Sequence, residues 1–295
     1  MDPGARAATT TSTKLFIPHP VDPSITIVGV LEQLAPGEHT RGRKIALILH
    51  GTMGHKDYLF QRRLALKLPL DSFRFDFRGN HETGGVWKQG ALEEDLEDLQ
   101  AVVDYLKATY GYVIELVVGH SRGALVAFRW LATTEDGRKV AAFVNASGRY
   151  RMAKIYESPA VKIWKEHFVK EGHYIWNVTV ARKQISAKIT PEDVQDFARW
   201  DTTFVWDRFP PGMDVLTLHG LADKTVPPYD ALIYAEALGA RSPGTHTLHL
   251  MEDADHNFTG RQDDVVDAVL HWWDVRRRGE LKTGIWVPAS IKGKL

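Results

Sequence analysis

The sequence predicts an α/β protein with a mostly parallel sheet covered by helices on both faces. From about residue 14 onward, strand-like and helical segments alternate, which is the order that builds a parallel sheet through crossover helices. The run Ile45–Leu49 is continuously apolar, as expected of a central strand buried on both faces. Leu92–Tyr110 has apolar residues at helical spacing and acidic residues in its first turns, which the helix dipole favours.

The predicted elements follow one another along the chain. Ser24–Leu34 is less hydrophobic than the other strands, so we expect it nearer an edge, whereas Lys44–His50 contains the central apolar run. Tyr112–Gly119 is rich in β-branched residues, and Arg122–Leu131 follows it with apolar residues at helical spacing. The remaining strands are expected over Phe73–Phe77, Val140–Asn145, Asp214–Leu218 and Thr245–Met251, and the remaining helices over Tyr58–Leu68, Tyr229–Leu238 and Asp263–Arg276.

Composition excludes several classes of function. With 295 residues, 44% of them hydrophobic, the chain can bury a large core. Basic and acidic residues number 37 each, so net charge provides no attraction for nucleic acid. The absence of cysteine excludes disulfides and a thiolate nucleophile. No apolar run reaches the roughly 18 residues of a membrane span, and no secretory pattern is visible, so we expect a cytoplasmic protein.

The alternation divides the chain into segments. We expect a flexible tail over 1–13, an α/β core over 14–148 and 210–278, a helical cap insertion over 149–209, and a C-terminal extension over 279–295. Eleven of the 30 Phe, Trp and Tyr residues fall within the insertion. Large rings of this kind make the core of a small insert or line a substrate cavity, and we expect both.

Gly119-His120-Ser121-Arg122-Gly123 lies between a predicted strand and a predicted helix. This is the G-x-S-x-G setting in which a serine becomes a nucleophile at the tip of a sharp turn. Glycines on either side of Ser121 let the strand and helix pack closely. A serine hydroxyl is a weak nucleophile until a base takes its proton, so Ser121 needs a histidine nearby.

His256 is the favoured base, because it follows the last predicted strand on a loop before the final helix, where functional groups of such sheets gather. The other strand-end histidines, His50 and His219, each precede a glycine and suit loop support, and His120 cannot easily reach the hydroxyl beside it. Asp223 follows the preceding strand, which gives the order Ser, Asp, His. The alternatives closer to His256 in sequence, Asp253 and Asp255, are less suited to the side-by-side geometry that orients an imidazole.

Two backbone amides are expected to stabilise the oxyanion of the reaction. The N–H of Arg122 stands at the start of a helix, where free amides favour an anion. The second donor is expected in the glycine-flanked loop after Lys44–His50, with Thr52 as its residue. Removing one such donor typically costs about 10²–10³ in rate.

Together these segments resemble the α/β-hydrolase superfamily over roughly residues 25–148 and 210–277. The resemblance implies a mostly parallel, eight-stranded twisted sheet, a triad of Ser121, Asp223 and His256, and oxyanion donors at Thr52 and Arg122. Within the superfamily, the loop after His50 resembles cinnamoyl/feruloyl esterases and serine-aminopeptidase-like enzymes. The segments that carry the resemblance are His50-Gly51-Thr52, Phe75-Asp76-Phe77-Arg78-Gly79, Gly119 to Gly123, His219 to Asp223 and Asp255-His256.

The sequence thus predicts a serine hydrolase that cleaves a carboxylic ester through an acyl-enzyme, with an apolar or aromatic substrate group. The alternatives are a thioesterase, lactonase, acyltransferase or aminopeptidase with the same triad, and a non-catalytic small-molecule-binding protein. An aminopeptidase would need an acid for the substrate ammonium, such as Glu157, Glu166 or Glu171. We expect a small-molecule ester as partner, no cofactor or metal, and a monomer or homodimer. Residues expected to contact the substrate are Met53, His120, Tyr150, Trp176 and Trp206.

Overall fold

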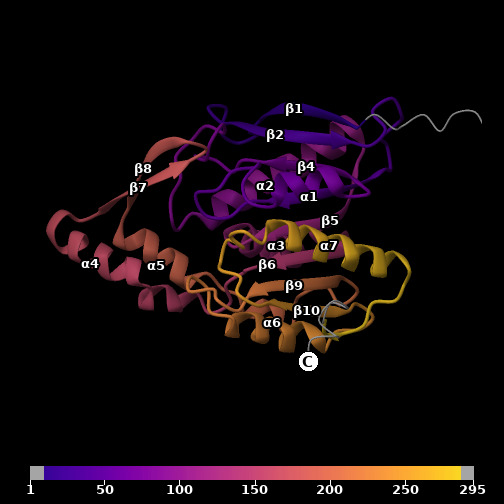
Figure 1. The fold of residues 1–295 in the computed structure, drawn as a ribbon. Coiled ribbons are helices and arrows are strands. Elements are labelled where there is room, and N and C mark those ends of the chain that lie inside the picture. Colours follow the sequence, from indigo (N-terminus) through magenta and orange to yellow (C-terminus); the bar gives the residue numbers. More distant parts are fainter. Residues whose placement is uncertain (1–9, 287–295) are drawn as a thin grey trace, which may run out of the picture.

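A twisted sheet with helices on both faces forms the body of the protein in the computed structural model, which describes residues 10–286 (Figure 1). Nine strands make up this sheet. In spatial order they are β1 (Thr11–Pro18), β2 (Thr26–Gln33), β4 (Asp71–Phe75), β3 (Lys44–Leu49), β5 (Val113–His120), β6 (Ala142–Ala146), β9 (Asp214–Gly220), β10 (His246–Met251) and β11 (Gly284–Ile285).

Most strand pairs are parallel, so their carboxyl ends meet at one edge of the sheet. From β4 through β11 every neighbouring pair is parallel, while β2 runs antiparallel to β1 and β4. The register aligns Leu49 with Gly119, and His120 with Ala146. The loops that follow β3, β5 and β6 therefore start at the same level.

The helices cover the sheet through two apolar cores, one on each face. Alternate residues of β3 enter different cores: Ile45, Leu47 and Leu49 face one, and Ala46 and Ile48 face the other, as the two-residue period of a strand requires. The first core is closed by α2 (Leu92–Tyr110), α3 (Arg122–Thr133) and α6 (Tyr229–Gly239), and the second by α1 (Gln61–Lys67) and α7 (Gln262–Arg277).

The predicted fold class is confirmed, with a largely parallel sheet between two helical layers. Over the described residues, however, the sheet has nine strands, whereas eight were expected. Strand β1 begins at Thr11, inside the predicted tail, and β11 lies inside the predicted C-terminal extension. Only Leu15 and Ile17 of β1 are buried, so its sequence carries little apolar alternation. The predictions for residues 1–9 and 287–295 lie outside the described residues.

The insertion between β6 and β9 is not purely helical, which corrects that prediction. It contains a two-stranded antiparallel hairpin between its helical segments. Residues of β7 alternate between half-buried and exposed, a two-residue period that marks a strand. The elements are η2 (Met152–Glu157), α4 (Pro159–Glu171), β7 (Tyr174–Val180), β8 (Lys183–Ile189), α5 (Pro191–Arg199) and η3 (Thr203–Val205).

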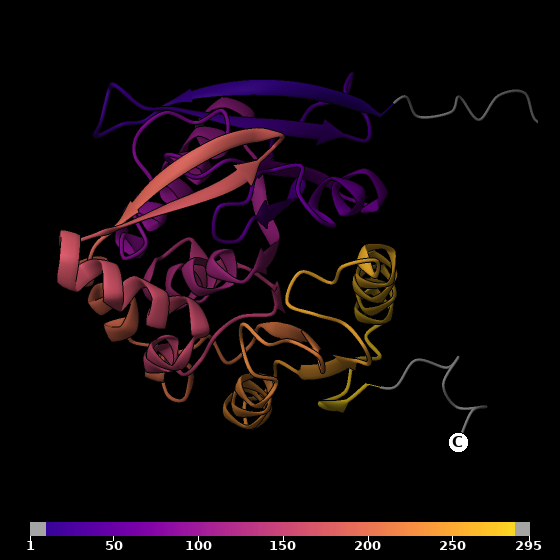
Figure 2. The same cartoon turned by 60° about the vertical axis from the view of Figure 1, so that its left-hand side comes forward.

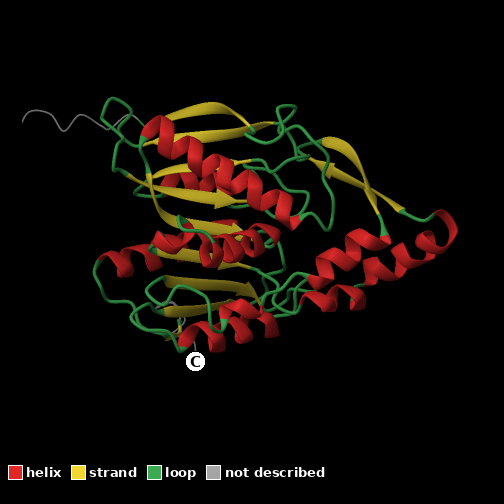
Figure 3. Ribbon diagram, turned by 180° about the vertical axis from the view of Figure 1, so that it is seen from behind, coloured by secondary structure: helices red, strands yellow, loops and turns green. Residues whose placement is uncertain are grey.

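The insertion stands beyond the end of the sheet toward which the parallel strands point. This arrangement is visible from both sides of the molecule (Figures 1 and 3), and Figure 2 shows the long hairpin β7–β8 extending away from α4. The insertion is therefore placed to cover the loops that follow β3, β5 and β10. Between residues 10 and 286, no helix combines the length and apolar character that crossing a bilayer requires.

Candidate active site

Ser121 occupies a strained turn between β5 and α3. Its φ of 52° and ψ of −115° lie in a region that side-chain-bearing residues rarely adopt. Such strain persists only where the surroundings hold it. A Cβ on Gly119 would lie 2.6 Å from the Cα of Ala124, and one on Gly123 would lie 2.5 Å from the carbonyl oxygen of His50. Both glycines are thus required for the close packing that exposes the serine at the tip.

Three loops bring a hydroxyl, an imidazole and a carboxylate into one hydrogen-bonded chain. His256 lies after β10, and its Nε2 is 2.9 Å from the Oγ of Ser121. Its Nδ1 is 2.8 Å from Oδ2 of Asp223, which lies after β9. The sequence predicted these three residues as a set, and the structure places them within hydrogen-bonding distance in series.

The surroundings of Asp223 keep this carboxylate ionised. Its Oδ1 accepts hydrogen bonds from the backbone N–H groups of Thr225 and Val226, each at 2.8 Å. Burial raises the pKa of Asp223, but hydrogen bonds from His219 and His256 outweigh that effect and hold the pKa below its usual range. An ionised acceptor at Nδ1 keeps the proton of His256 on that nitrogen, which leaves Nε2 free to accept the serine proton.

The acids closest to His256 in sequence do not serve this role. Asp255 uses its Oδ1 to accept hydrogen bonds from the N–H groups of Asn257 and Thr259, at 3.0 and 2.8 Å. It therefore shapes its own loop. Asp253 is exposed in the same loop and has a φ of 55°.

Thr52 and Arg122 both line the space beside Ser121. Arg122 is the first residue of α3, so its N–H has no acceptor within the helix. The Arg122 side chain is buried and forms an ion pair, in which its Nε donates to Asp95 at 2.5 Å, while its Nη1 donates to the carbonyl of Gln89 at 2.6 Å. Burial raises the pKa of Asp95 to about 6, against the opposing effect of Arg122.

This ion pair leads to a prediction about stability. Arg122→Met leaves Asp95 buried without its cation, which is expected to lower the free energy of unfolding by about 3–5 kcal/mol. The double variant Arg122→Met/Asp95→Leu removes both charges and is expected to recover more than half of that loss. Urea unfolding of the two variants and the wild type measures both quantities. A double variant less stable than Arg122→Met would show that the pair does not act as a unit.

His120 and His50 support the site as neutral rings. The Nε2 of His120 lies 2.9 Å from the carbonyl oxygen of His256, and burial lowers the pKa of His120 to about 3. His50 donates from Nδ1 to the carbonyl of Gly51 and accepts the N–H of Phe77 at Nε2. Burial lowers the pKa of His50 to about 4. His120 thus fixes the backbone of His256. The sequence did not predict this supporting role, because it depends on a contact with a residue 136 positions away.

A cavity of about 1000 Å³ opens beside Ser121 and His256, between the sheet edge and the insertion. Met53, His120 and Trp176, which are among the residues expected to contact the substrate, line this cavity. Tyr150 and Trp206 do not, which corrects the expectation that they contact substrate. Instead the indole N–H of Trp206 donates to the hydroxyl of Tyr150 at 2.8 Å. The two-residue period of β7 could have identified two further lining residues, Tyr174 and Val178.

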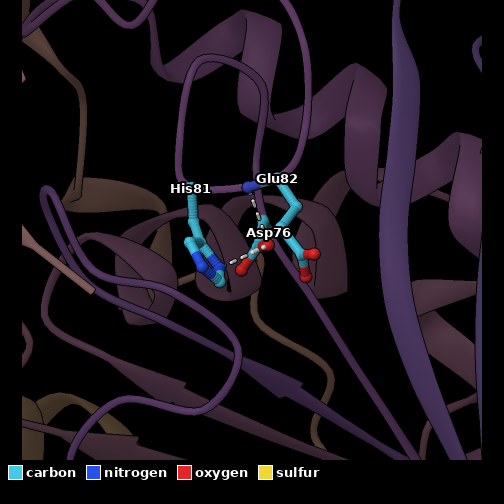
Figure 4. A group of neighbouring side chains, drawn as sticks. All are labelled: Asp76, His81 and Glu82. Atoms are coloured by element: carbon cyan, nitrogen blue, oxygen red, sulfur yellow. Dashed lines mark hydrogen bonds and ion pairs between the residues drawn. The ribbon is translucent and has the colours of Figure 1, made fainter. Parts of the chain in front are cut away.

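Asp76, His81 and Glu82 form the one cluster of potential metal ligands within the described residues (Figure 4). The Nζ of Lys56, however, lies 2.7 Å from Oδ2 of Asp76 and 2.5 Å from Oε2 of Glu82. Its buried ammonium already supplies the cation that these carboxylates require. The N–H of Lys56 also donates to Asp76 at 2.7 Å. The cluster therefore anchors the loop after β3, which carries Thr52.

Sequence comparison identifies relatives of this chain. A profile of the alpha/beta hydrolase family matches residues 46–268. The chain is also 28% identical over 250 residues to the uncharacterized protein YDL057W of Saccharomyces cerevisiae, a match that covers 75% of this chain and 70% of the yeast protein.

Solved structures share the fold at low sequence identity. Est1E from Butyrivibrio proteoclasticus, in its complex with ferulic acid, has a TM-score of 0.69 and 19% identity, covering 88% of this chain and 97% of that protein. The esterase Pf2001 from Pyrococcus furiosus has a TM-score of 0.62 and 19% identity, covering 91% and 93%. At such identities the likeness establishes a common fold.

Proposed function

The chain belongs to the alpha/beta hydrolase family, and from this premise we propose that it is a serine hydrolase that cleaves a carboxylic ester. The observation that carries the proposal is the chain of contacts from Ser121 through His256 to Asp223, at 2.9 and 2.8 Å, on the wall of a large cavity. A nucleophile, a base and an orienting acid in series are the requirements of acyl transfer.

In the proposed reaction, the Oγ of Ser121 attacks the ester carbonyl while His256 Nε2 takes the serine proton. The N–H groups of Arg122 and Thr52 stabilise the resulting oxyanion. When the tetrahedral intermediate collapses, His256 donates the proton to the departing alcohol and an acyl-enzyme remains. Water then attacks the acyl group as His256 accepts its proton. The second intermediate releases the acid, and the proton returns to Ser121.

The cavity wall favours an apolar or aromatic substrate group. Aromatic side chains of the insertion, Trp164, Tyr174 and Trp176, line the cavity together with aliphatic residues. The complex of Est1E with ferulic acid provides an aromatic acid bound by a protein of the same fold. A thioesterase, lactonase or acyltransferase would use the same residues, and an ester is the simplest substrate of this set.

An aminopeptidase fits the cavity less well. It would need a carboxylate to bind the ammonium group of its substrate. No Asp or Glu is among the cavity-lining residues of the described chain, and Glu157, Glu166 and Glu171 lie outside this set.

The proposal is tested by reaction with a fluorophosphonate probe, which labels activated serines. We expect one equivalent to attach to the wild-type protein, at the peptide that contains Ser121, together with hydrolysis of p-nitrophenyl esters of increasing chain length and of methyl cinnamate. A folded protein that neither labels nor hydrolyses any of these esters would contradict the proposal and favour the small-molecule-binding alternative.

A further inference from the structure

The cavity beside Ser121 is lined by arginine side chains, which give it positive charge. No Asp or Glu is among the described residues that line it. Its three arginines are Arg122, Arg149 and Arg182. Arg122 is paired with Asp95. Neither of the other two has a carboxylate oxygen within 4.0 Å in the described part of the chain. The cavity wall thus holds two cationic side chains that form no ion pair with a carboxylate of residues 10–286.

Arg149 is the better defined of these two groups. It follows β6 and is only 7% exposed. Its Nη2 donates to the carbonyl of Thr225 at 2.5 Å, and its own carbonyl accepts a hydrogen bond from the hydroxyl of Tyr234 at 2.8 Å. The first contact fixes the guanidinium at the cavity wall and the second fixes the backbone of Arg149. Other donors among the five N–H groups of the guanidinium remain available.

The two acids that act on Arg149 have other partners. Asp230 accepts from Nε of Arg151 at 2.5 Å and from the backbone N–H groups of Tyr150 and Arg151. Asp223 is bound to His256 and to backbone amides. Burial lowers the pKa of Arg149, yet a guanidinium stays charged in proteins. A buried charge without a paired anion is costly, and an anionic ligand would relieve that cost.

We propose that Arg149 binds a free carboxylate of the substrate, so that the protein acts on esters that combine an apolar or aromatic body with one carboxylate. The inference rests on the proposed function and specifies its substrate class. A planar guanidinium matches a carboxylate with two parallel hydrogen bonds. One buried arginine balances one negative charge, while most of the remaining wall, such as Leu125, Ile155 and Trp176, accommodates the body of the molecule.

Two matched pairs of esters test this inference. 4-Nitrophenyl hydrogen glutarate and 4-nitrophenyl pentanoate differ by a carboxylate on the acyl side, and 4-acetoxybenzoate and its methyl ester differ by one on the alcohol side. We expect kcat/KM of the wild type to favour the anionic member of at least one pair by tenfold or more. Arg149→Met is expected to reduce that preference about 10- to 100-fold, the usual effect of losing a charged hydrogen bond.

The matched control is Arg62→Met, which removes an exposed arginine on α1 outside the cavity and is expected to keep the wild-type preference. If Arg149→Met lowers both members of a pair equally, Arg149 only positions the loop of Thr225 and the inference fails. If that variant does not fold, the wild type alone decides: it must prefer an anionic ester, and glutarate must inhibit hydrolysis competitively.

Failure of this inference differs from failure of the proposed function. A protein that labels with fluorophosphonate but hydrolyses neutral esters at least as well as anionic ones would keep its function and refute the carboxylate site. In a protein that does not label, calorimetric titration with glutarate still tests the site. Binding that is lost in Arg149→Met would support it, and no binding by the wild type would overturn it.

Discussion

Ser121→Ala is expected to lower kcat/KM for ester hydrolysis by about 10⁴-fold or more and to abolish fluorophosphonate labelling. The substitution removes the only atom that would bond to the acyl group, while the backbone donors of Arg122 and Thr52 remain. Removing the nucleophile of a hydrogen-bonded triad leaves only the rate acceleration due to binding and oxyanion stabilisation. Initial rates on a p-nitrophenyl ester and mass spectrometry of the labelled protein measure the two effects.

A second serine provides a close control. Ser147 follows β6 as Ser121 follows β5, is buried, and also has a positive φ, of 53°. Its hydroxyl has no hydrogen-bond partner in the described structure, and it does not line the cavity. Ser147→Ala should therefore keep nearly full activity and labelling. Equal activity of wild type and Ser121→Ala would exclude the proposed mechanism.

Asp223→Asn is expected to lower kcat by about 10⁴-fold with little change in fold, because it reverses the tautomer of His256. The amide oxygen of asparagine would accept the N–H groups of Thr225 and Val226, as Oδ1 of the aspartate does. Its NH₂ group would then face Nδ1 of His256 and require that nitrogen to accept. The proton of the ring would move to Nε2, where it blocks transfer from Ser121.

Steady-state kinetics against pH, with circular dichroism to verify folding, measure this effect. Asp253→Asn is the matched control, since it makes the same chemical change in an exposed acid near His256 in the sequence, and its activity should stay near that of the wild type. A larger loss in Asp253→Asn than in Asp223→Asn would reverse the assignment of the acid.

Much of the fold could be predicted because its signals are local. The continuous apolar run of β3 identifies a strand that is buried on both faces. The spacing of apolar residues in α2 identifies a helix that is buried along one stripe, and α2 occupies the predicted residues Leu92–Tyr110. The sequence does not predict the elements that bury few residues. Strand β1 buries two residues, and the hairpin β7–β8 is half exposed, so neither shows a strong hydrophobic pattern.

The residues proposed for catalysis could also be selected from local sequence, since a strand-turn-helix with two glycines leaves one serine at its tip. Their positions after predicted strands distinguished His256 from most other histidines and Asp223 from most other acids. The supporting contacts could not be selected in this way. The bond of His120 to the His256 carbonyl and the pairing of Arg122 with Asp95 join residues 136 and 27 positions apart, and no local pattern encodes such distances.

Short stretches of the chain were enough to specify the central strands and the helices that cover them, and the turn at Ser121, because backbone preference and hydrophobic period belong to short segments. They did not specify β1, β11 or the hairpin β7–β8. The composition, which contains no cysteine, excluded thiol chemistry. Which side chains share the cavity was settled only by the packed fold. Packing excluded Tyr150 and Trp206 from the wall and placed Arg149 there, with no ion-pair partner in the part of the chain that the structure describes. Burial and charge pairing depend on distances between segments that are remote in the sequence. Those distances are determined by how the insertion packs over the sheet.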